Sequence, residues 1–301
     1  MKLQRISNKP ILEPRANIPW EKSAVLNAAA IHDGSHFHLF YRAVAHNPGS
    51  LNESCIGHAI SRDGIHFDRF DTPILANKQS PEESRGVEDP RITKIGDTYH
   101  LSYVAWDTRR TVISRATSND LKTWTRRGIM FPYEQFGNNK NAALFPEKIG
   151  GRYALIHRPM GFAWDDHDYP LDMWMSFSDD LKQWDGHRRL LRARRGEIAW
   201  EHGKIGLGGA PHKTARGWLM IYHAMAGNTY RLGCAMLDIK DPTKVLWRTD
   251  EPILEPELDW EKNGDVSNVV FTCGSVLLGD ELWVYYCGAD SRIGLAKCIF
   301  R

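Results

Sequence analysis

Short runs of alternating apolar and polar residues recur along the chain, and each run begins at a turn that contains glycine. The five runs occupy residues 33–41, 96–103, 151–157, 217–223 and 279–286. The turn glycines at positions 34, 96, 151, 217 and 279 are 62, 55, 66 and 62 residues apart. A period of two next to a glycine turn is typical of the second strand of a hairpin. The pattern therefore predicts five similar hairpins and an all-β fold.

A second pattern follows three of the hairpins and leads from a turn rich in Ser and Asp to a buried aromatic residue. It spans residues 61–67, 118–124 and 178–184, and a weaker copy spans residues 238–247. Such turns suit the connection between a third and a fourth strand. Repeats of this length indicate units that stack radially or in a line. We therefore expect a five-bladed β-propeller.

The two ends of the chain carry the same short sequence. Residues 9–14 and 251–256 share Pro-Ile-Leu-Glu-Pro, and residues 20–22 match residues 260–262. The last blade, from about residue 269 to residue 300, has room for only three strands. Residues near Arg5 to Leu12 should supply its fourth strand, which would close the ring and leave no exposed sheet edge. The whole chain, residues 1–301, would then be a single domain.

The composition is that of a globular protein with a large core, with 301 residues of which 42% are hydrophobic and 25% charged. The formal net charge of +2 is spread along the chain, so neither nucleic acid nor an acidic membrane is expected as a partner. No apolar run approaches the ~20 residues of a membrane span, and the N-terminal residues lack a signal-peptide core. We expect a cytoplasmic protein. Whether identical chains assemble into an oligomer stays open.

The cysteines are expected to be reduced thiols in the core, because their number is odd, they show no CxxC spacing and most lie in apolar runs. They are Cys55, Cys234, Cys273, Cys287 and Cys298. The histidines of the first hairpin, among them His38 and His58, alternate along strand faces. We do not expect them to bind a metal.

Charge is concentrated in Gly86-Val87-Glu88-Asp89-Pro90-Arg91, immediately before a strand-like run. Proline restricts the residue before it to extended geometry, so successive side chains should alternate there. Glu88 and Asp89 would then point in opposite directions, with one acid facing a cavity and the other bracing the turn. A charged turn without a catalytic role is the alternative for this hexapeptide taken alone.

Polar residues recur near equivalent strand ends in all five hairpins. Because the innermost strands of a propeller line its channel, these residues should converge on one pocket. Its acids are led by Asp89 and Asp290, and its cationic groups are Lys140, Arg158, Lys204 and His223. This composition indicates a site for an anion beside a carboxylic acid.

Other chemistries lack the residues that they need. No Ser-His-Asp or Cys-His arrangement fits the strand spacing, and no HExxH motif or Cys/His set indicates a metal. Residues 206–209 are rich in glycine but open no helix, so we interpret them as a close-packed inner strand and not as a phosphate loop.

The hexapeptide at 86–91 resembles a motif of glycoside hydrolase family 130, as do residues 144–149, 157–159, 204–206, 217–223 and 264–271. The likeness runs from about Asn27 to Ala296 in the same order and at similar spacing. That family consists of five-bladed propellers that are mostly β-mannoside phosphorylases. The resemblance implies inverting phosphorolysis of a mannobiose, oligomannoside or mannosyl-glucose to α-mannose 1-phosphate. Inorganic phosphate would be the co-substrate, and no cofactor would be needed. An inverting glycosidase needs a base to activate water, whereas phosphate arrives as an anion, so one acid with a cluster of cations supports phosphorolysis.

The resemblance also implies roles for individual residues. Asp89 would be the proton donor, with its proton relayed through a hydroxyl of the mannose. The mannose would be held by Asn27, Arg42 and Asp290, and the phosphate by Lys140, Asn141, Arg158, Lys204 and His223. Lys140 stands where members often carry arginine, and lysine lacks the bidentate fork, which would weaken phosphate binding. Ala28, at a position that can be polar in relatives, leaves one sugar contact open.

Two other functions stay open from the sequence. An inverting β-mannosidase on the same fold would need a carboxylate base such as Glu201, and a sugar-binding propeller would need no catalysis. Residues 164–170 form a polar and aromatic insertion after the strand end at 157–159. They are expected either to rim the pocket and contact the leaving sugar or to form a plain surface loop.

Overall fold

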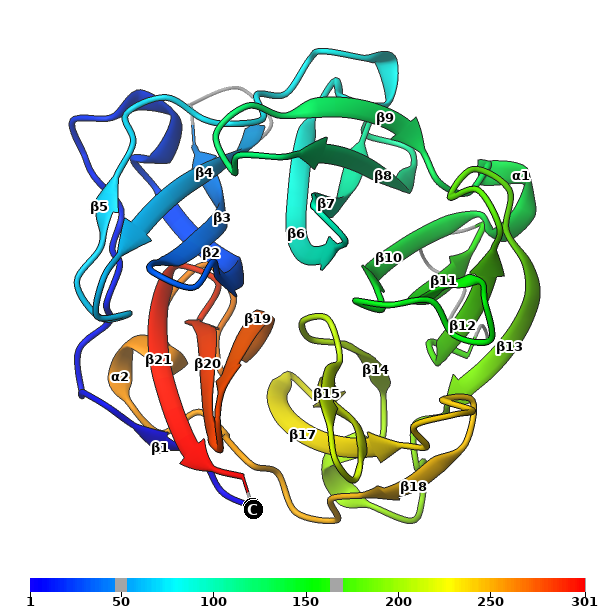
Figure 1. Cartoon of the computed structure of the whole chain (residues 1–301). Coiled ribbons are helices and arrows are strands. Elements are labelled where there is room, and N and C mark those ends of the chain that lie inside the picture. Colours follow the sequence, from blue (N-terminus) through cyan, green and yellow to red (C-terminus); the bar gives the residue numbers. More distant parts are fainter. Residues whose placement is uncertain (47–52, 163–169, 301) are drawn as a thin grey trace.

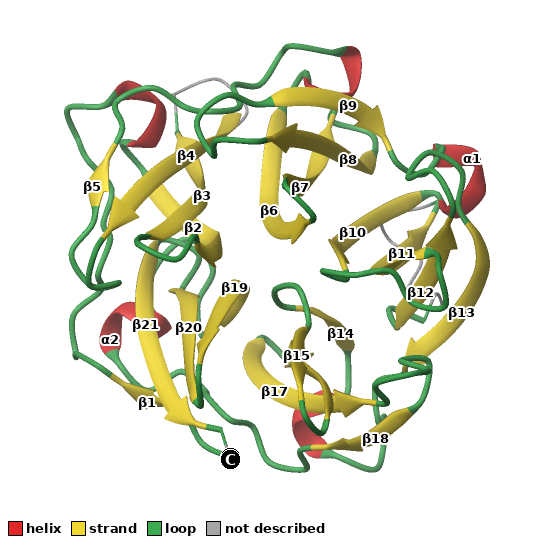
Figure 2. Ribbon diagram, in the orientation of Figure 1, coloured by secondary structure: helices red, strands yellow, loops and turns green. Residues whose placement is uncertain are grey.

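Antiparallel strands make up most of the computed structural model, which describes residues 1–46, 53–162 and 170–300. The sheets are arranged around a common centre, with β2, β6, β10 and β19 nearest the middle (Figure 1). The helices of the described residues are short (Figure 2) and comprise η1 (Pro19–Glu21), η2 (Pro81–Glu83), α1 (Tyr133–Phe136), η3 (Ala199–Glu201) and α2 (Asp259–Lys262). The all-β class predicted from the alternation is confirmed.

Hydrogen bonds divide the strands into antiparallel groups that follow one another along the chain. The first group contains β2 (Ala24–His32), β3 (Phe37–Ala45), β4 (Glu53–Ser61) and the short β5 (Asp68–Arg69). The second contains β6 (Gly86–Ile95), β7 (Thr98–Trp106), β8 (Thr111–Ser118) and β9 (Thr125–Ile129). A single parallel bridge between Ser54 and Gly86 joins these two groups into one sheet.

The other three groups form separate sheets. The third contains β10 (Asn138–Leu144), β11 (Tyr153–Gly161), β12 (Met173–Ser178) and β13 (Asp185–Leu191). The fourth contains β14 (Lys204–Leu207), β15 (His212–Thr214), β16 (Gly217–Ala226), β17 (Thr229–Leu237) and β18 (Val245–Arg248). The last contains β19 (Val270–Leu278), β20 (Glu281–Gly288), β21 (Arg292–Ile299) and β1 (Gln4–Arg5). In the first, second, third and last groups the first strand lies toward the centre (Figure 1).

The turns have the residue types that their geometry requires. Gly217 has a φ of +138°, and a Cβ at this position would lie 2.2 Å from the carbonyl oxygen of Leu237. In the turn from β4 to β5, Asp63 Oδ1 accepts the backbone N–H groups of Ile65 at 2.9 Å and His66 at 2.8 Å. The same pair of bonds recurs at Asp120 between β8 and β9 and at Asp180 between β12 and β13. The predicted connections between third and fourth strands are confirmed in these three groups.

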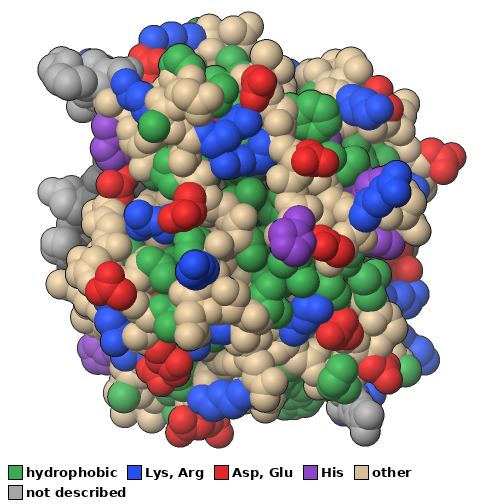
Figure 3. Space-filling view, turned by 90° about the vertical axis from the view of Figure 1, so that its left-hand side faces the viewer, with side chains coloured by type: hydrophobic (Ala, Val, Ile, Leu, Met, Phe, Trp, Pro, Cys, Tyr) green, Lys and Arg blue, Asp and Glu red, His purple; other side chains and the backbone are tan. Residues whose placement is uncertain are grey.

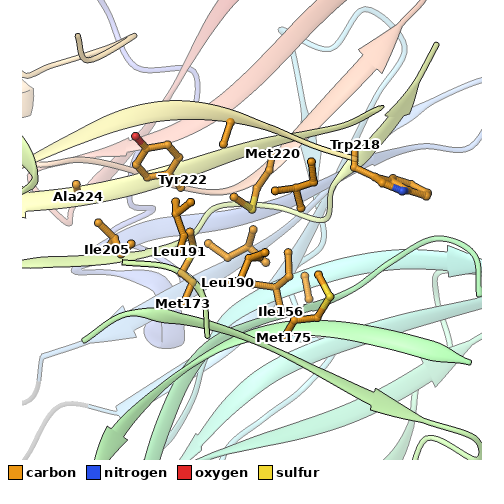
Figure 4. Packing of buried hydrophobic residues seen from close by; sticks show 14 of the residues in the cluster. Ile156, Met173, Met175, Leu190, Leu191, Ile205, Trp218, Met220, Tyr222 and Ala224 are labelled. Carbon is orange, nitrogen blue, oxygen red and sulfur yellow. The ribbon is translucent and has the colours of Figure 1, made fainter. Parts of the chain in front are cut away.

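The core lies mainly between neighbouring groups of strands. One buried cluster fills the space between the third and fourth groups, where Ile156, Met175 and Met220 pack together (Figure 4). Side chains from facing sheets interdigitate there, so each group depends on its neighbour for burial of its apolar faces. All five cysteines are free, and only Cys298 is not fully buried, as the sequence predicted.

A buried glutamate binds a tyrosine hydroxyl in four of the groups, an arrangement that we call the Glu-Tyr clamp. Its pairs are Glu21 with Tyr41, Glu83 with Tyr103, Glu201 with Tyr222 and Glu261 with Tyr286. Each glutamate also forms an ion pair with at least one arginine, such as Arg126 with Glu83 at 3.0 Å. The glutamates belong to segments that precede the inner strands, so the clamp ties these segments to the sheets.

The N-terminal segment completes the last group. Gln4 and Arg5 of β1 pair antiparallel with Lys297 and Ala296 of β21, and Leu12 forms a further bridge to Ile293. Figure 1 shows this blue segment beside the red β21. The strand pairing predicted for residues 5–12 is thus present at both ends of that segment.

The surface carries charge of both signs. Acidic and basic side chains are interspersed on the face shown in Figure 3. None of the described helices has the length and apolar character needed to cross a membrane.

Candidate active site

Three inner strands contain a bulge at equivalent positions. The pairing register shifts between Leu26 and Ala29 in β2, between Glu88 and Arg91 in β6, and between Lys140 and Ala143 in β10. One polar residue in each bulge has a left-handed backbone, with a φ of 50° at Asn27, 49° at Asp89 and 57° at Asn141. Asn and Asp tolerate this conformation better than most residues. The bulges direct these polar side chains toward the centre of the molecule.

The bulge corrects the expectation that Asp89 is extended and that Glu88 and Asp89 face opposite ways. The unpaired residues of a bulge break the period-two alternation, so the preference imposed by Pro90 does not decide the geometry. Both carboxylates instead contact Arg42, at 2.6 Å from Nη2 to Glu88 Oε1 and at 3.6 Å from Nη1 to Asp89 Oδ1. Glu88 therefore binds cations and does not brace the turn.

All nine candidate site residues line one pocket of about 390 Å³. They are Asn27, Arg42, Asp89, Lys140, Asn141, Arg158, Lys204, His223 and Asp290. Arg158 is the register partner of Lys140 across β10 and β11, and His223 is the partner of Gly206 across β14 and β16. The convergence predicted for the strand ends is confirmed, whereas the roles of these residues stay predictions.

Asp89 and Asp290 form the acidic side of the pocket. Asp89 is 7% exposed and accepts a hydrogen bond of 2.7 Å from Asn27 Nδ2. Burial raises the pKa of Asp89, but Arg42, Lys140 and Arg91 outweigh this effect and hold the pKa below its ordinary value. Burial instead raises the pKa of Asp290 above its ordinary value. The two acids therefore have different affinities for a proton.

The pocket also contains cationic groups that repel one another. Burial and neighbouring cations lower the pKa of Lys204 to about 8 and that of Arg158 to about 10, and they lower the pKa of His223 well below its ordinary value. In the described part of the chain, Arg158 Nε, Asn141 Oδ1 and both ring nitrogens of His223 are buried without a hydrogen-bond partner. Buried polar atoms of this kind are normally paired. An anion with several acceptor oxygens would satisfy the donors and offset the repulsion.

Glycines bring the backbone of β14 close to this cluster. A Cβ on Gly206 would lie 2.5 Å from His223 Nε2 and 2.8 Å from Asn141 Oδ1. Arg91, 1% exposed, donates hydrogen bonds to the carbonyl oxygens of Leu207, Gly208 and Asp89 at 2.9, 2.6 and 3.0 Å. Gly206 and Leu207 thus belong to the close-packed strand β14, as predicted, whereas Gly208 and Gly209 follow its end.

Glu201, the sequence candidate for a hydrolytic base, does not reach the pocket. It is fully buried in the Glu-Tyr clamp, where it binds Tyr222 and accepts bonds from Arg194 at 2.8 and 2.9 Å. The sequence could have indicated this, because Glu21, Glu83 and Glu261 occupy equivalent places before other hairpins. Among the described residues, no group of three His, Cys, Asp or Glu side chains is arranged to hold a metal ion.

The sequence of the chain is similar to those of known proteins. A family model described as beta-1,4-mannooligosaccharide phosphorylase matches residues 2–301. The chain belongs to glycoside hydrolase family 130. A 1,2-beta-oligomannan phosphorylase of Thermoanaerobacter sp. (strain X514) is 46% identical and aligns over 98% of this chain and 97% of its own length. A beta-1,2-mannobiose phosphorylase of the same strain is 47% identical over 98% of this chain and 96% of its own length.

One solved structure is similar to almost the whole of this chain. The beta-1,2-mannobiose phosphorylase of Listeria innocua, in complex with beta-1,2-mannobiose, is 30% identical and has a TM-score of 0.88. The match covers 99% of this chain and 97% of that chain. The family assignment that the sequence motifs suggested is thus confirmed.

The pocket of this family 130 protein also contains residues that the sequence did not single out as site residues. They are Met160, Leu171, Tyr230, Val269 and Phe271. Lys204 Nζ lies 5.0 Å from the ring centre of Tyr230, and the rings of Phe271 and His223 are 4.2 Å apart. Tyr230 lies on β17 opposite Met225 of β16, and the sequence of either strand alone does not give this register. Residues 164–169 of the predicted rim loop lie outside the described residues.

Proposed function

We propose that this protein is an inverting phosphorylase that cleaves a β-mannoside with inorganic phosphate and releases α-mannose 1-phosphate. The observation that carries the proposal is one pocket that combines a buried acid, Asp89, with a cluster of cationic groups. The names of the two Thermoanaerobacter relatives favour a β-1,2 linkage, in mannobiose or a longer oligomannan.

The residues divide into two sets in this proposal. Asn27, Arg42 and Asp290 hold the mannose, and phosphate lies between Lys140, Arg158 and Lys204 with Asn141 and His223 beside it. A phosphate oxygen attacks the anomeric carbon from the face opposite the glycosidic bond, so the configuration inverts. The bond from this carbon to the leaving oxygen breaks as the new bond to the phosphate oxygen forms. Asp89 supplies the proton that the leaving oxygen takes up, relayed through a hydroxyl of the mannose.

Phosphate also makes Asp89 a better proton donor in this proposal. The cations of the pocket favour the ionised form of Asp89, whereas a general acid must hold its proton until transfer. Phosphate carries roughly −1.5 to −2 charges at neutral pH. Its charge offsets the field of Lys140 and Arg158 and raises the pKa of the acid. Phosphate would therefore bind before proton transfer. Without bound phosphate, the ionised form of Asp89 is favoured, so hydrolysis would be slow.

Hydrolysis is the less favoured chemistry because two of the carboxylates that could act as base are bound by other groups. Glu201 belongs to the Glu-Tyr clamp, and both carboxylate oxygens of Glu88 bind cations. Asp290 also lines the pocket, and its Oδ1 lies 3.3 Å from Cys287 Sγ. In this proposal Asp290 binds the mannose, and the assay without phosphate tests whether it activates water instead.

We also infer that the chain is a single five-bladed β-propeller, residues 1–301, closed by its N-terminal strand. Five antiparallel groups arranged around one centre support this inference (Figure 1). Contacts between inner strands of neighbouring groups, such as β2 with β6 and with β19, support it further. The pocket would then lie at one end of the central channel.

The deciding experiment incubates the protein with β-1,2- and β-1,4-linked mannobiose and with mannosyl-glucose, each with and without phosphate. We expect mannose 1-phosphate to form with phosphate, and proton NMR of the fresh product to show the α-anomer. Free mannose formed at the same rate without phosphate would establish the hydrolase instead. No turnover of any sugar, together with mannose binding by calorimetry, would establish a sugar-binding protein.

A further inference from the structure

Glu88 lies beside the pocket without lining it, and the proposed reaction gives it no role. The residue is 2% exposed. Oε1 accepts a hydrogen bond from Arg42 Nη2 at 2.6 Å, and Oε2 accepts one from Lys140 Nζ at 3.3 Å. A buried carboxylate is costly unless it is paired, and Glu88 is paired at both oxygens. In the proposed function, Arg42 binds the mannose and Lys140 binds the phosphate.

Asp89 competes for the same two cations. Arg42 Nη1 is 3.6 Å from Asp89 Oδ1, which is within ion-pair range but too long for a good hydrogen bond. The hydrogen bond that Asp89 does accept comes from a neutral donor, Asn27, at 2.7 Å. Arg42 is thus hydrogen-bonded to Glu88 and held at a greater distance from Asp89.

We propose that Glu88 is a positioning residue, which binds Arg42 and Lys140 as a shared counter-ion and so keeps both cations from closing onto Asp89. The inference rests on the function proposed above, in which Asp89 must hold a proton. A close pair between a cation and a carboxylate favours the ionised acid. If the side chain of Arg42 moved into contact with Asp89, it would also lose the orientation in which it is proposed to bind mannose.

Several other charged or titratable groups face Asp89 from the strands around it. They are Arg42 on β3, Arg91 on β6, Lys140 on β10, Arg158 on β11, Tyr230 on β17, Cys273 on β19 and Asp290 after β20. Of these, Arg42 and Lys140 are the two that hydrogen-bond to Glu88. A change at Glu88 should therefore reach Asp89 through these two side chains.

The first test compares the pH profiles of kcat for the wild type and Glu88→Gln. Because the acid must be protonated, activity falls as the pH rises through its pKa, and this fall forms the alkaline limb of the profile. With Glu88 neutral, the cations shift toward Asp89, and the limb should move to lower pH by about one unit. On that limb, kcat should be about tenfold lower than in the wild type.

Glu83→Gln is the matched control. Glu83 is also 2% exposed and binds a tyrosine and an arginine, Tyr103 and Arg126, but it lies in the Glu-Tyr clamp. This variant should lose stability and keep the alkaline limb of the wild type. An equal shift in both variants, or no shift in folded Glu88→Gln, would overturn the proposal.

Glu88→Asp covers the case in which the glutamine variant does not fold. It keeps the negative charge, but its side chain is one methylene group shorter, so the charge lies farther from both cations. Its alkaline limb should lie between those of the wild type and Glu88→Gln. A limb identical to the wild type in Glu88→Asp, when the glutamine variant is unfolded, would contradict the proposed role.

A crystal structure of Glu88→Gln, or of Glu88→Asp if the former is unfolded, tests the same inference without activity. We expect a nitrogen of Arg42 or Lys140 within about 3 Å of the Asp89 carboxylate. Unchanged separations of both Arg42 and Lys140 from Asp89 would overturn the proposal. A wild type that fails to turn over any β-mannoside with phosphate would refute the proposed function, whereas this structure would still decide the role of Glu88.

Discussion

Asp89 occupies a backbone conformation that few residue types tolerate, and this determines which substitution tests its chemistry. With a φ of 49°, its position suits aspartate, asparagine and glycine. Asp89→Asn should keep the backbone but cannot deliver a proton, so kcat should fall by at least ~10²-fold. Asp89→Ala should show the same loss of activity and a lower thermal midpoint as well. Near-normal kcat in Asp89→Asn would show that Asp89 is not the acid.

Arg158 tests the anion site, because it is buried beside Lys204 and His223, and its Nε has no hydrogen-bond partner among the described residues. Loss of a charge-assisted hydrogen bond costs about 1.5–3 kcal/mol, or about a ten- to hundredfold loss of binding. Arg158→Ala should therefore raise the KM for phosphate far more than the KM for the mannoside. Millimolar phosphate should raise the thermal midpoint of the wild type and do so much less in this variant.

Arg115→Ala is a suitable control for this measurement. Arg115 is 8% exposed, similar to Arg158 at 5%, but it lies on β8 outside the pocket. The control should be less stable than the wild type and keep the full stabilisation by phosphate. Equal phosphate-induced shifts in Arg158→Ala and the wild type, at ionic strength matched with chloride, would rule out this phosphate site.

At the scale of strands, the alternating pattern predicted the hairpins and the end of each strand at which polar residues gather. It could not predict the bulges, because the register shift depends on how two strands pair and not on the sequence of one. The alternation therefore predicted opposite orientations for Glu88 and Asp89, although both side chains contact Arg42. Tyr230 was missed for a related reason, since only the pairing of β17 with β16 brings it beside Lys204.

The Glu-Tyr clamp gives a prediction that separates a structural carboxylate from a catalytic one. Glu201→Gln removes the charge that compensates buried Arg194, and breaking such a pair typically costs about 3–5 kcal/mol. Tyr222→Phe removes one hydrogen bond to a charged group, which is worth about 1.5–3 kcal/mol. Both variants should unfold at lower denaturant concentration and keep the wild-type kcat when folded. Loss of turnover in folded Glu201→Gln would revive its role as a base.

At the scale of the whole molecule, the pocket draws residues from Asn27 near the start of the chain to Asp290 near its end. The pocket residues come from several strand groups, so the site forms only when these groups are correctly arranged around the centre. The core supports this dependence, because its clusters lie between groups and not within one of them. The sequence repeats predicted that these residues converge, because polar or charged side chains occupy equivalent strand ends in different hairpins.

The N-terminal segment should be essential to that architecture, and its deletion is the clearest test. Removing residues 1–12 abolishes the pairing of β1 with β21, the ion pair of Arg5 with Glu261 at 2.7 Å, and the burial of Leu3 and Leu12. Burial of two leucines alone is worth roughly 3–6 kcal/mol. The truncated protein should melt at a lower temperature and aggregate, because β21 becomes an exposed edge strand.

Arg5→Ala separates the strand from the ion pair in this experiment. It removes the contacts of Arg5 with Glu257 and Glu261 but leaves the backbone of β1 able to pair with Ala296 and Lys297. We expect a smaller loss of stability than in the truncation and no increase in light scattering at the melting transition. If the truncated protein instead kept the thermal midpoint and the solubility of the wild type, the N-terminal strand would be dispensable, and the inference that it closes the ring would be wrong.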